Sequence, residues 1–387
     1  MILKAARIAL GATETSIRDV GIEAGRLRLC PPADTGPELD LAGFLILPGL
    51  INAHDHLEFN LFPRLGRGPY SNATAWAADI HRSHPETVRR QLNIAKPVRL
   101  VWGGIKNLIS GVTSVLHHNP YDPVFDYGFP IRVIRRFGWS HSLAFSTDLA
   151  RDWAATPPKA PFFIHACEGT DSESAAEITR LDSAGMLGPY TVLVHGVALD
   201  RAGLDLVKKR RASLVWCPSS NHFTLGRTLS RETLDCGIPI ALGTDSALTA
   251  TGDLIDEIEV ARCVVGVERI YRMVTDMAAR VLRLRSGEGT IREGGIADLV
   301  VVRDLVEQPA QALLGMHPEM VLVGGRVKLI SMPLADRLPF ALTRRLQPFR
   351  IEDGGEWLID SNISTLLEVG KRTLGEEFRL AGKAVAA

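Results

Sequence analysis

Residues 44–56 read Phe-Leu-Ile-Leu-Pro-Gly-Leu-Ile-Asn-Ala-His-Asp-His, an apolar run that ends in two histidines separated by one residue. Five more short apolar runs lie further along the chain, at residues 111–116, 162–164, 191–194, 213–216 and 238–242. Continuous apolar runs of this length are typical of strands buried on both faces, which occur almost only in parallel α/β sheets. The sequence therefore predicts a parallel sheet with helices between its strands.

The polar residues that close these runs recur at regular intervals. His165, His195, Cys217 and Asp245 follow one another at intervals of 22 to 30 residues, and each interval accommodates a strand, a covering helix and two loops. Room for two more strands remains between residues 117 and 161. The pattern predicts eight βα units closed as a (β/α)8 TIM-type barrel, and an open doubly wound sheet is the competing architecture.

The two ends of the chain have a different sequence pattern. Residues 1–48 and 285–345 contain short β-branched and aliphatic runs broken by Gly and Pro, and neither end is long enough to bury a core alone. We expect them to form one small composite β-sandwich, with the barrel spanning residues 49–284. The charged, amphipathic residues 346–387 are expected to form a C-terminal helical tail.

Composition excludes several classes of partner. The 387 residues carry 44 Lys and Arg against 44 Asp and Glu, so the net charge is +0 and no overall field attracts nucleic acid or an anionic membrane. No run approaches the about 20 apolar residues of a membrane span, and the N-terminus lacks the apolar core of a signal peptide. The five cysteines form no CxxC pair, which predicts reduced thiols. We expect a cytoplasmic protein with a small-molecule partner, and a homodimer is compatible with the sequence.

The predicted strand ends supply metal ligands. Because side chains alternate along a strand, His54 and His56 point to one side and Asp55 to the other. Four ligands of the type His, His, His and carboxylate, drawn from these strand ends, suit a divalent ion such as zinc or ferrous iron, with a position left for water. A single histidine at a strand end is usually structural, but several at matching intervals predict a shared site at the carboxyl end of the barrel.

Proton transfer and substrate contacts follow from the same strand ends. Glu168, three residues after His165, suits a proton shuttle. His195 is either a further ligand or a group that hydrogen-bonds the metal-bound water. Asp245 would ligate the metal with one oxygen and take a proton from water with the other.

The loop after the first barrel strand, residues 58–70, is expected to cover the site. Arg64 or Arg67 would then hold an anionic group of the substrate, and an exposed structural arginine is the alternative. Since His117 and His118 alternate faces, only one looks into the barrel; we predict that His118 does, as a substrate contact or as a core contact. Asn221 is a third predicted substrate contact.

Six segments carry a family resemblance, and they occur in a characteristic order. They are Pro-Gly-Leu-Ile-Asn-Ala-His-Asp-His at 48–56, His-Ala-Cys-Glu at 165–168, Val-His-Gly at 194–196, Cys-Pro-Ser-Ser-Asn at 217–221, Leu-Gly-Thr-Asp-Ser at 242–246 and Gly-Gly-Ile-Ala-Asp-Leu-Val-Val-Val at 294–302. Together they resemble the amidohydrolase superfamily, in the branch that contains cytosine, guanine and S-adenosylhomocysteine deaminases and the triazine hydrolases. The resemblance covers about residues 1–330 and implies a metal-bearing barrel joined to a small β-sandwich.

The resemblance also implies roles for individual residues. It implies one metal held by His54, His56, His165 and Asp245, with two catalytic residues that are not primary ligands, Glu168 and His195. Two-metal members use a carboxylated lysine at an inner strand end. No lysine of the barrel region closes an apolar run here, which favours one metal; the lysines are Lys96, Lys106, Lys159, Lys208 and Lys209.

The activity implied is hydrolysis of a non-peptide C–N bond. Its leading form is deamination of a heterocyclic amidine, of purine, pyrimidine or pterin type, by metal-hydroxide attack. Hydrolysis of a cyclic amide, or displacement of a halide or amine from a triazine, would use the same site. A catalytically inactive scaffold is a further alternative, and the presence of all six site positions argues against it.

Overall fold

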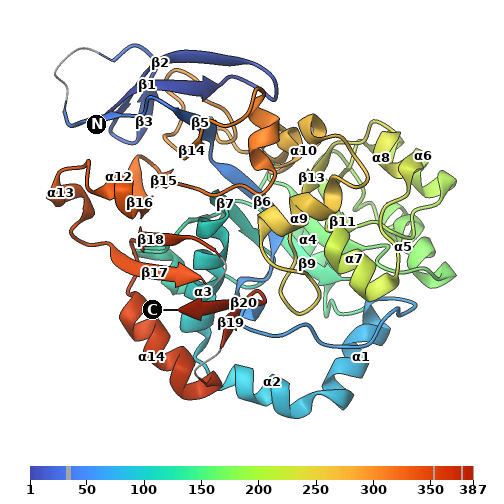
Figure 1. Cartoon of the computed structure of the whole chain (residues 1–387). Helices are drawn as coiled ribbons and strands as arrows, with labels where there is room; N and C mark the ends of the chain where they lie inside the picture. Colours follow the sequence, from blue (N-terminus) through green and yellow to red (C-terminus); the bar gives the residue numbers. More distant parts are fainter. Residues whose placement is uncertain (32–35, 352–353, 376–377, 387) are drawn as a thin grey trace.

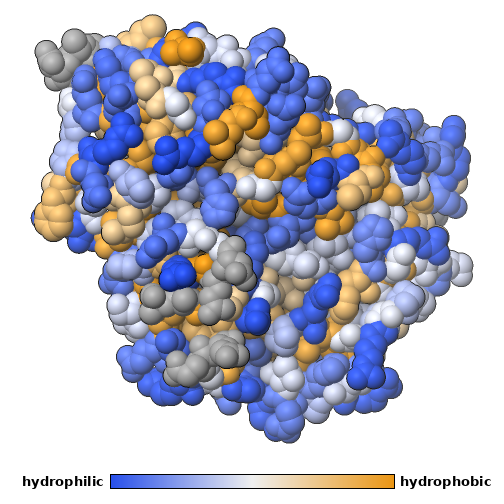
Figure 2. All heavy atoms as spheres, viewed as in Figure 1, coloured by the Kyte–Doolittle hydropathy of each residue, from blue (hydrophilic) through white to orange (hydrophobic). Residues whose placement is uncertain are grey.

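The computed structural model describes residues 1–31, 36–351, 354–375 and 378–386. Within these ranges the chain has a mixed α/β fold with parallel sheets at its centre and a large, mainly antiparallel sheet along one side (Figure 1). None of the described helices combines the length and the apolar character needed to cross a membrane. Figure 2 shows hydrophilic residues over much of the visible face, with apolar residues in smaller groups between them.

Eight parallel strands form the centre of the molecule. They are β6 (Leu50–Asp55), β7 (Val112–His117), β8 (Arg132–Val133), β9 (Gly138–Ser142), β10 (Phe162–Ala166), β11 (Thr191–His195), β12 (Ser213–Trp216) and β13 (Ile240–Leu242). One sheet has the order β6-β7-β8 and the other the order β13-β12-β11-β10-β9. The two sheets meet just after β13, where the backbone N–H of Asp245 donates to the carbonyl oxygen of His54 (3.0 Å).

The apolar runs predicted as strands are all confirmed as strands, and β8 and β9 fill the space left for two more. The first run differs in one respect, because it is divided at Gly49 between β5 (Phe44–Pro48) and β6. A Cβ atom at Gly49 would clash with the side chain of Thr113 in β7. Gly49 therefore allows the chain to pass from the antiparallel sheet into the parallel one.

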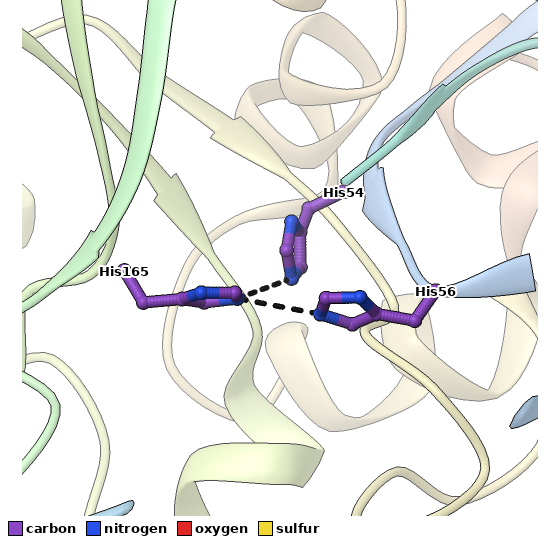
Figure 3. Close-up of side chains that lie close together, drawn as sticks. All are labelled: His54, His56 and His165. Carbon is purple, nitrogen blue, oxygen red and sulfur yellow. Dashed lines mark hydrogen bonds between the residues drawn. The ribbon is translucent and has the colours of Figure 1, made fainter. Parts of the chain in front are cut away.

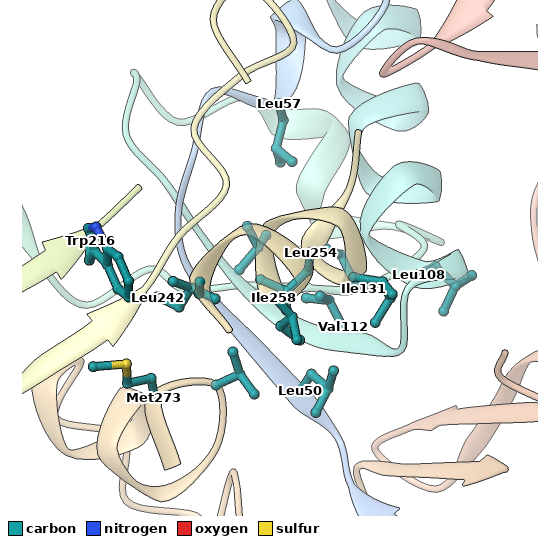
Figure 4. Packing of buried hydrophobic residues seen from close by; sticks show 14 of the residues in the cluster. Leu50, Leu57, Leu108, Val112, Ile131, Trp216, Leu242, Leu254, Ile258 and Met273 are labelled. Carbon is teal, nitrogen blue, oxygen red and sulfur yellow. The ribbon is translucent and has the colours of Figure 1, made fainter. Parts of the chain in front are cut away.

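Helices cover the outer side of the parallel strands (Figure 1). The described helices of this part are α1 (Ala73–Ser83), α2 (Pro85–Leu92), α3 (Lys96–Ile109), α4 (Leu149–Ala154), α5 (Ser172–Ser183), α6 (Arg201–Arg210), α7 (Pro218–Leu225), α8 (Arg231–Asp235), α9 (Leu254–Ala261), α10 (Val267–Met273) and α11 (Asp276–Val281). Short 3-10 turns are η1 (Leu57–Phe59), η2 (Pro123–Asp126) and η3 (Pro309–Leu313). Figure 4 shows Leu50 and Val112 of the strands beside Leu254 and Ile258 of α9, all within one buried apolar cluster. This packing holds the strand ends in place.

The large sheet joins both ends of the chain. Its N-terminal strands are β1 (Ile2–Ala9), β2 (Thr15–Glu23), β3 (Arg26–Arg28), β4 (Glu38–Asp40) and β5. The later strands are β14 (Leu299–Arg303), β15 (Met320–Val323), β16 (Arg326–Ser331), β17 (Gln347–Ile351), β18 (Glu356–Ile359), β19 (Arg379–Leu380) and β20 (Lys383–Ala386). The two groups meet where β5 pairs antiparallel with β14, with Ile46 opposite Val301. Residues 1–48 and the region after residue 285 thus lie side by side.

The prediction of a helical tail at residues 346–387 was wrong. The described part of this segment holds the four strands β17 to β20 and a single helix, α14 (Ile363–Leu374); two short helices, α12 (Met332–Ala335) and α13 (Phe340–Thr343), precede it. In β17 the buried residues Phe349 and Ile351 alternate with more exposed ones. That two-residue period is the pattern of a strand with one buried face. The C-terminal strands lie beside α3 (Figure 1) and extend the large sheet.

Candidate metal centre and active site

Three imidazoles converge at the carboxyl ends of two parallel strands. His54 lies in β6, His56 follows that strand and His165 lies in β10, and all three are buried. The Nε2 atom of His165 is 3.2 Å from Nε2 of His54 and 3.3 Å from Nε2 of His56 (Figure 3). The alternation of side chains along β6 thus places both of its histidines on one side.

Asp245 joins this cluster from the turn after β13. Its Oδ1 atom is 3.8 Å from Nε2 of His54 and 3.7 Å from Nε2 of His56. The backbone of Asp245 has a φ of 58°, in the left-handed region that residues with a Cβ adopt infrequently. Such conformations are frequent at functional sites, where the surrounding structure enforces them.

Hydrogen bonds hold the carboxylate of Asp245 in its ionised form. The hydroxyls of Ser220 and Thr249 donate to Oδ2 (2.7 and 3.1 Å), and the backbone N–H of Ser246 donates to Oδ1 (2.7 Å). Burial opposes ionisation of this group. The imidazole of His56 and the hydrogen bonds outweigh it, so that the pKa of Asp245 lies below its ordinary value.

The spacing of the three imidazoles fits a divalent cation, and the carboxylate of Asp245 adds a fourth donor near two of them. In a tetrahedral zinc site with Zn–N bonds of about 2.0–2.1 Å, neighbouring ligand nitrogens lie about 3.3 Å apart. The two Nε2 separations to His165 are 3.2 and 3.3 Å. Three imidazoles with one carboxylate are also a ligand set that zinc and ferrous iron accept. The cluster therefore supports binding of a divalent metal.

The ring of His165 is oriented for metal binding. Its Nδ1 atom donates to the carbonyl oxygen of His141 (2.7 Å), which leaves the lone pair of Nε2 free to face the cluster. Burial and the neighbouring imidazoles hold the pKa values of His54 and His165 well below the ordinary value. Both rings are therefore neutral at pH 7, which is the form that binds a metal.

Glu168 faces the cluster from the turn after β10. Its Oε1 atom is 3.5 Å from Nε2 of His195, and its side chain is 16% exposed. Burial raises the pKa of Glu168 well above its ordinary value, and the negative charges of Asp245 and Glu177 raise it further. A carboxyl group whose pKa is raised holds its proton more readily than an ordinary glutamate, as the predicted shuttle requires.

His195 ends β11, and its tautomer is fixed by Asn221. The hydroxyl of Thr228 donates to Oδ1 of Asn221 (3.5 Å), which turns the Nδ2 group of Asn221 towards Nδ1 of His195 (2.8 Å). Nδ1 therefore accepts, and the proton of this ring lies on Nε2, directed towards Glu168. Burial lowers the pKa of His195 to about 4. The amide of Asn221 is thus placed to orient His195, and its predicted contact with substrate stays a prediction.

A cavity of about 420 Å³ lies beside these groups. Its lining includes His165 and Glu168 together with His141 and Phe145, and its volume is in the range of pockets for small organic ligands. The ring centroid of His141 is 4.8 Å from that of His165. His141 was not predicted from the sequence, because β9 reads Gly-Trp-Ser-His-Ser and lacks the apolar run that identified the other strands.

Arg64 lies outside that cavity. It lines a separate cavity of about 750 Å³, where its guanidinium donates to Oγ1 of Thr251 (3.0 Å) and lies 4.8 Å from the ring centroid of Phe223. The adjacent side chain of Leu65 is buried, which leaves Arg64 and Arg67 on the outside of the loop. The structure does not bring either arginine to the histidine cluster, so the alternative of an exposed structural arginine describes their positions.

His118 faces the cluster and His117 faces away from it. The ring of His118 is 4.4 Å from that of His165, and its Nε2 is 3.1 Å from the carbonyl oxygen of Ser140. His118 is fully buried and is not among the residues that line the cavity, so the core-contact alternative describes its position, and a contact with substrate stays a prediction. His117 instead accepts a hydrogen bond at Nδ1 from the backbone N–H of Leu57 (3.2 Å).

Cys167 and Cys217, the two cysteines near the site, have no features of a reactive thiol. Both are free and buried, and burial raises the pKa of each above its ordinary value. A nucleophilic cysteine needs a lowered pKa and access to a substrate. Their burial therefore supports a structural role.

Several relatives of known sequence are deaminases of adenosine-type compounds. The chain is 36% identical over 135 residues to a 5-methylthioadenosine/S-adenosylhomocysteine deaminase of Pyrococcus furiosus, an alignment that covers 32% of each chain. It is 24% identical over 323 residues to the deaminase of the same name from Syntrophobacter fumaroxidans, covering 68% of this chain and 73% of that one. A 5'-deoxyadenosine deaminase of Methanothermobacter thermautotrophicus is 24% identical over 327 residues, covering 70% and 76%. The chain thus spans about a third of the first relative and about three quarters of the other two.

Solved structures and a family model agree on the fold. An adenosine deaminase of Xanthomonas campestris with bound zinc has a TM-score of 0.71 at 17% identity, over 96% of this chain and 97% of that one. A zinc complex of atrazine chlorohydrolase from Arthrobacter aurescens has a TM-score of 0.66 at 15% identity, over 84% and 94%. The model of the Amidohydrolase family matches residues 133–328, just over half of the 387 residues, and this segment contains His165, Glu168, His195 and Asp245. The chain therefore belongs to the amidohydrolase family.

Proposed function

We propose that this protein is a metal-dependent hydrolase that deaminates a heterocyclic amidine, with adenosine-type nucleosides as the first candidate substrates. The observation that carries the proposal is the convergence of three buried imidazoles and the carboxylate of Asp245 beside Glu168 and His195. The relatives named as deaminases of adenosine-type compounds support the substrate class. In this reaction water adds to the ring carbon that bears the amino group, and ammonia leaves.

The proposal includes the closure of the central strands into a (β/α)8 barrel over residues 49–284. Contact between the turn after β13 and β6, through Asp245 and His54, supports it. The likeness to solved structures of this superfamily also supports it. Residues 1–48 and 285–345 would form the composite β domain, which the pairing of β5 with β14 favours.

Four residues would hold one divalent cation, with zinc as the first candidate and ferrous iron as the alternative; they are His54, His56, His165 and Asp245. When bound, the cation supplies Lewis-acid chemistry and lowers the pKa of water towards neutrality. One metal is favoured over two, because the buried Lys106 pairs with Asp55 and does not reach the cluster as a bridging ligand.

The remaining residues move protons and stabilise charge. Glu168, whose raised pKa keeps a proton available, would donate it to the ring nitrogen beside the reacting carbon. Once ionised, Glu168 would take the proton of the newly added hydroxyl and deliver it to the departing amino group, and the proton that Asp245 accepts from water would restore the protonated Glu168. The Nε2–H of His195 lies on the same side and would donate a hydrogen bond to the oxygen that develops on that carbon. The ionised carboxylate of Asp245 would accept a proton from water.

A panel of substrates distinguishes the proposed reaction from its alternatives. The purified protein would be analysed for bound metal, then loaded with zinc or with ferrous iron and assayed with adenosine, 5-methylthioadenosine, S-adenosylhomocysteine, 5'-deoxyadenosine, cytosine, guanine and a pterin. A triazine and a cyclic amide would test the alternative bonds. We expect ammonia release from at least one adenosine-type nucleoside, and none after substitution of His165 by alanine.

Other outcomes would redirect the proposal. Turnover of the triazine or the cyclic amide without ammonia release from any nucleoside would favour the alternative chemistry. A protein that binds neither metal would favour the inactive scaffold. The cytoplasmic location, the homodimer and the absence of nucleic-acid or membrane partners stay predictions.

A further inference from the structure

A buried ion pair lies directly behind the histidine cluster. Nζ of Lys106, in α3, is 2.8 Å from Oδ2 of Asp55, the residue between His54 and His56. The side chains of Lys106 and Asp55 are 1% and 0% exposed. Because desolvation of both charges offsets most of their attraction, such a pair is weak evidence for a contribution to stability. Its position next to two candidate ligands points to another role.

The carboxylate of Asp55 is the centre of a hydrogen-bond network. The side-chain amide of Asn107, in α3, donates to Oδ2 (2.8 Å), and that of Asn60 donates to Oδ1 (2.9 Å). Oδ1 of Asn60 in turn accepts from the backbone N–H of Ala247 (3.2 Å). This arm of the network reaches the backbone two residues after Asp245.

A second arm reaches the backbone just before Asp245. Nζ of Lys106 donates to Oγ1 of Thr244 (3.1 Å), and the hydroxyl of Thr244 donates to the carbonyl oxygen of Asp245 (2.8 Å). Oδ1 of Asn52 accepts from the backbone N–H groups of Thr244 (3.1 Å) and His54 (3.3 Å). The network therefore ties the end of β6 to the turn after β13 on both sides of Asp245.

This hydrogen-bond network is important because of the backbone conformation of Asp245. Its φ of 58° is unfavourable for a residue with a Cβ, and such a conformation persists only where the surroundings over-determine it. In this conformation Oδ1 lies 3.7 and 3.8 Å from the Nε2 atoms of His56 and His54. A relaxed backbone would turn the carboxylate away from both imidazoles.

We propose that Asp55 and Lys106 are positioning residues of the metal centre. By joining α3, the end of β6 and the turn after β13, they keep His54, His56 and Asp245 at the separations that one cation requires. Neither residue touches the cluster's Nε2 atoms or the cavity beside Glu168, so their effect is exerted through the ligands. The inference rests on the proposed metal-dependent function.

The test measures zinc affinity by competition with a chelating indicator, using the zinc ion alone as the probe. Lys106→Met keeps an unbranched side chain that lacks only the terminal nitrogen position, and it removes the charge and the hydrogen bonds. We expect zinc to bind about 10- to 100-fold more weakly, as for other groups that orient metal ligands. A merely structural role would lower the Tm of the metal-free and zinc-loaded forms equally, whereas loss of positioning narrows the gap between the two Tm values.

A double variant covers the case in which Lys106→Met fails to fold because Asp55 is left as an unpaired buried charge. Asp55→Asn combined with Lys106→Met removes both charges and also the link to Thr244. We expect this protein to fold and to retain weakened zinc binding. Wild-type zinc affinity in the double variant would overturn the inference, since the network would then be dispensable.

Lys328→Met is the matched control. Lys328 is also a buried lysine in an ion pair, with Nζ 2.7 Å from Oδ2 of Asp360, but it lies in β16 of the large sheet. We expect its zinc affinity to equal that of the wild type, and an equal loss in this variant would overturn the inference. A wild-type protein that binds no zinc would instead overturn the proposed function, and the inference with it.

Discussion

The two sides of the histidine cluster differ in how fully their polar atoms are paired. On the side of β6 and α3, the carboxylate of Asp55 accepts hydrogen bonds from Lys106, Asn107 and Asn60, all within 3.0 Å. On the side of the cavity, the nearest described partner of the Glu168 carboxylate is a histidine nitrogen at 3.5 Å. Both sides carry a carboxylate, but only that of Glu168 is left without close hydrogen-bond partners and can therefore interact with a substrate.

This difference separates a supporting region from a reactive one. A fully paired buried network fixes geometry, because no member can move without losing a partner. A poorly paired carboxyl with a raised pKa retains the capacity to exchange a proton with a substrate. The comparison predicts that substitutions on the cavity side reduce turnover and leave metal binding unchanged. Substitutions in the histidine cluster itself should abolish both metal binding and turnover.

Removal of a candidate metal ligand should have the largest effect. His165→Ala deletes one of the three converging Nε2 atoms and leaves the cavity otherwise intact. Loss of several kcal/mol of Lewis-acid stabilisation corresponds to a loss of turnover of about 10³-fold or more. Metal analysis and ammonia release would be measured on the same preparation. A variant that keeps stoichiometric metal and full turnover would exclude His165 as a ligand.

Substitution of Glu168 should separate turnover from metal binding. Glu168→Gln keeps the size of the side chain but removes its ability to exchange a proton, so we expect kcat to fall by about 10²- to 10⁴-fold. Metal content should equal that of the wild type. Glu173→Gln is a suitable control, because Glu173 lines the same cavity from the first turn of α5. Nearly full activity in the Glu168 variant would remove Glu168 from the mechanism.

Much of the fold was predictable because buried parallel strands have a recognisable sequence pattern. Their two buried faces require continuous apolar runs, and each of the predicted runs is a strand. The large sheet obeys a different rule. In β17 buried and exposed residues alternate. An amphipathic helix contains a similar mixture of apolar and polar residues, and only the period of the pattern distinguishes the two. That similarity explains the incorrect helical tail.

The converging side chains of the candidate site were predictable for the same reason, whereas the residues that support them were not. His54, His56 and His165 lie at strand ends, and the carboxyl ends of parallel strands meet at one edge. Lys106 and the adjacent Asn107 lie in a largely apolar stretch of α3, and nothing in their spacing identifies Asp55 as the partner of Lys106. Partners of this kind depend on how a helix packs on a strand, which a local pattern does not record.

Substitution of Asn221 tests a group that supports a residue of the cavity side, His195. Asn221→Ala removes the amide that holds Nδ1 of His195 as an acceptor, so the proton on Nε2 is no longer enforced. We expect kcat to fall by about 10- to 100-fold, the range for groups that orient a functional imidazole, with KM and metal content little changed. Steady-state kinetics on the metal-loaded enzyme measures the split. A change confined to KM would instead support the sequence-based prediction that Asn221 contacts the substrate.

Glu257 is a buried carboxyl whose hydrogen bonds do not offset the effect of burial on its pKa. Its carboxyl, in α9, accepts a hydrogen bond from the backbone N–H of Ser219 (2.9 Å) and another from the hydroxyl of that residue. Burial raises the pKa of Glu257 to about 8, although the hydrogen bonds from Ser219 lower it. Among the facing charges, Asp245 raises this pKa and Lys106 lowers it.

The raised pKa of Glu257 makes stability depend on pH in a defined direction. The ordinary pKa of a glutamate in an unfolded chain is near 4.5, so between there and about 8 the folded protein holds one more proton than the unfolded chain. The free energy of unfolding therefore falls as pH rises through this window, by about 1.4 kcal/mol per pH unit. Glu257→Gln removes this dependence, so the wild type should lose about 2 kcal/mol relative to the variant between about pH 6 and 7.5. Urea denaturation of both chelator-treated proteins measures the difference, in which the titration of the shared histidines cancels. A difference that is constant across this range would show that Glu257 is ionised in the folded protein and is as fully paired as Asp55.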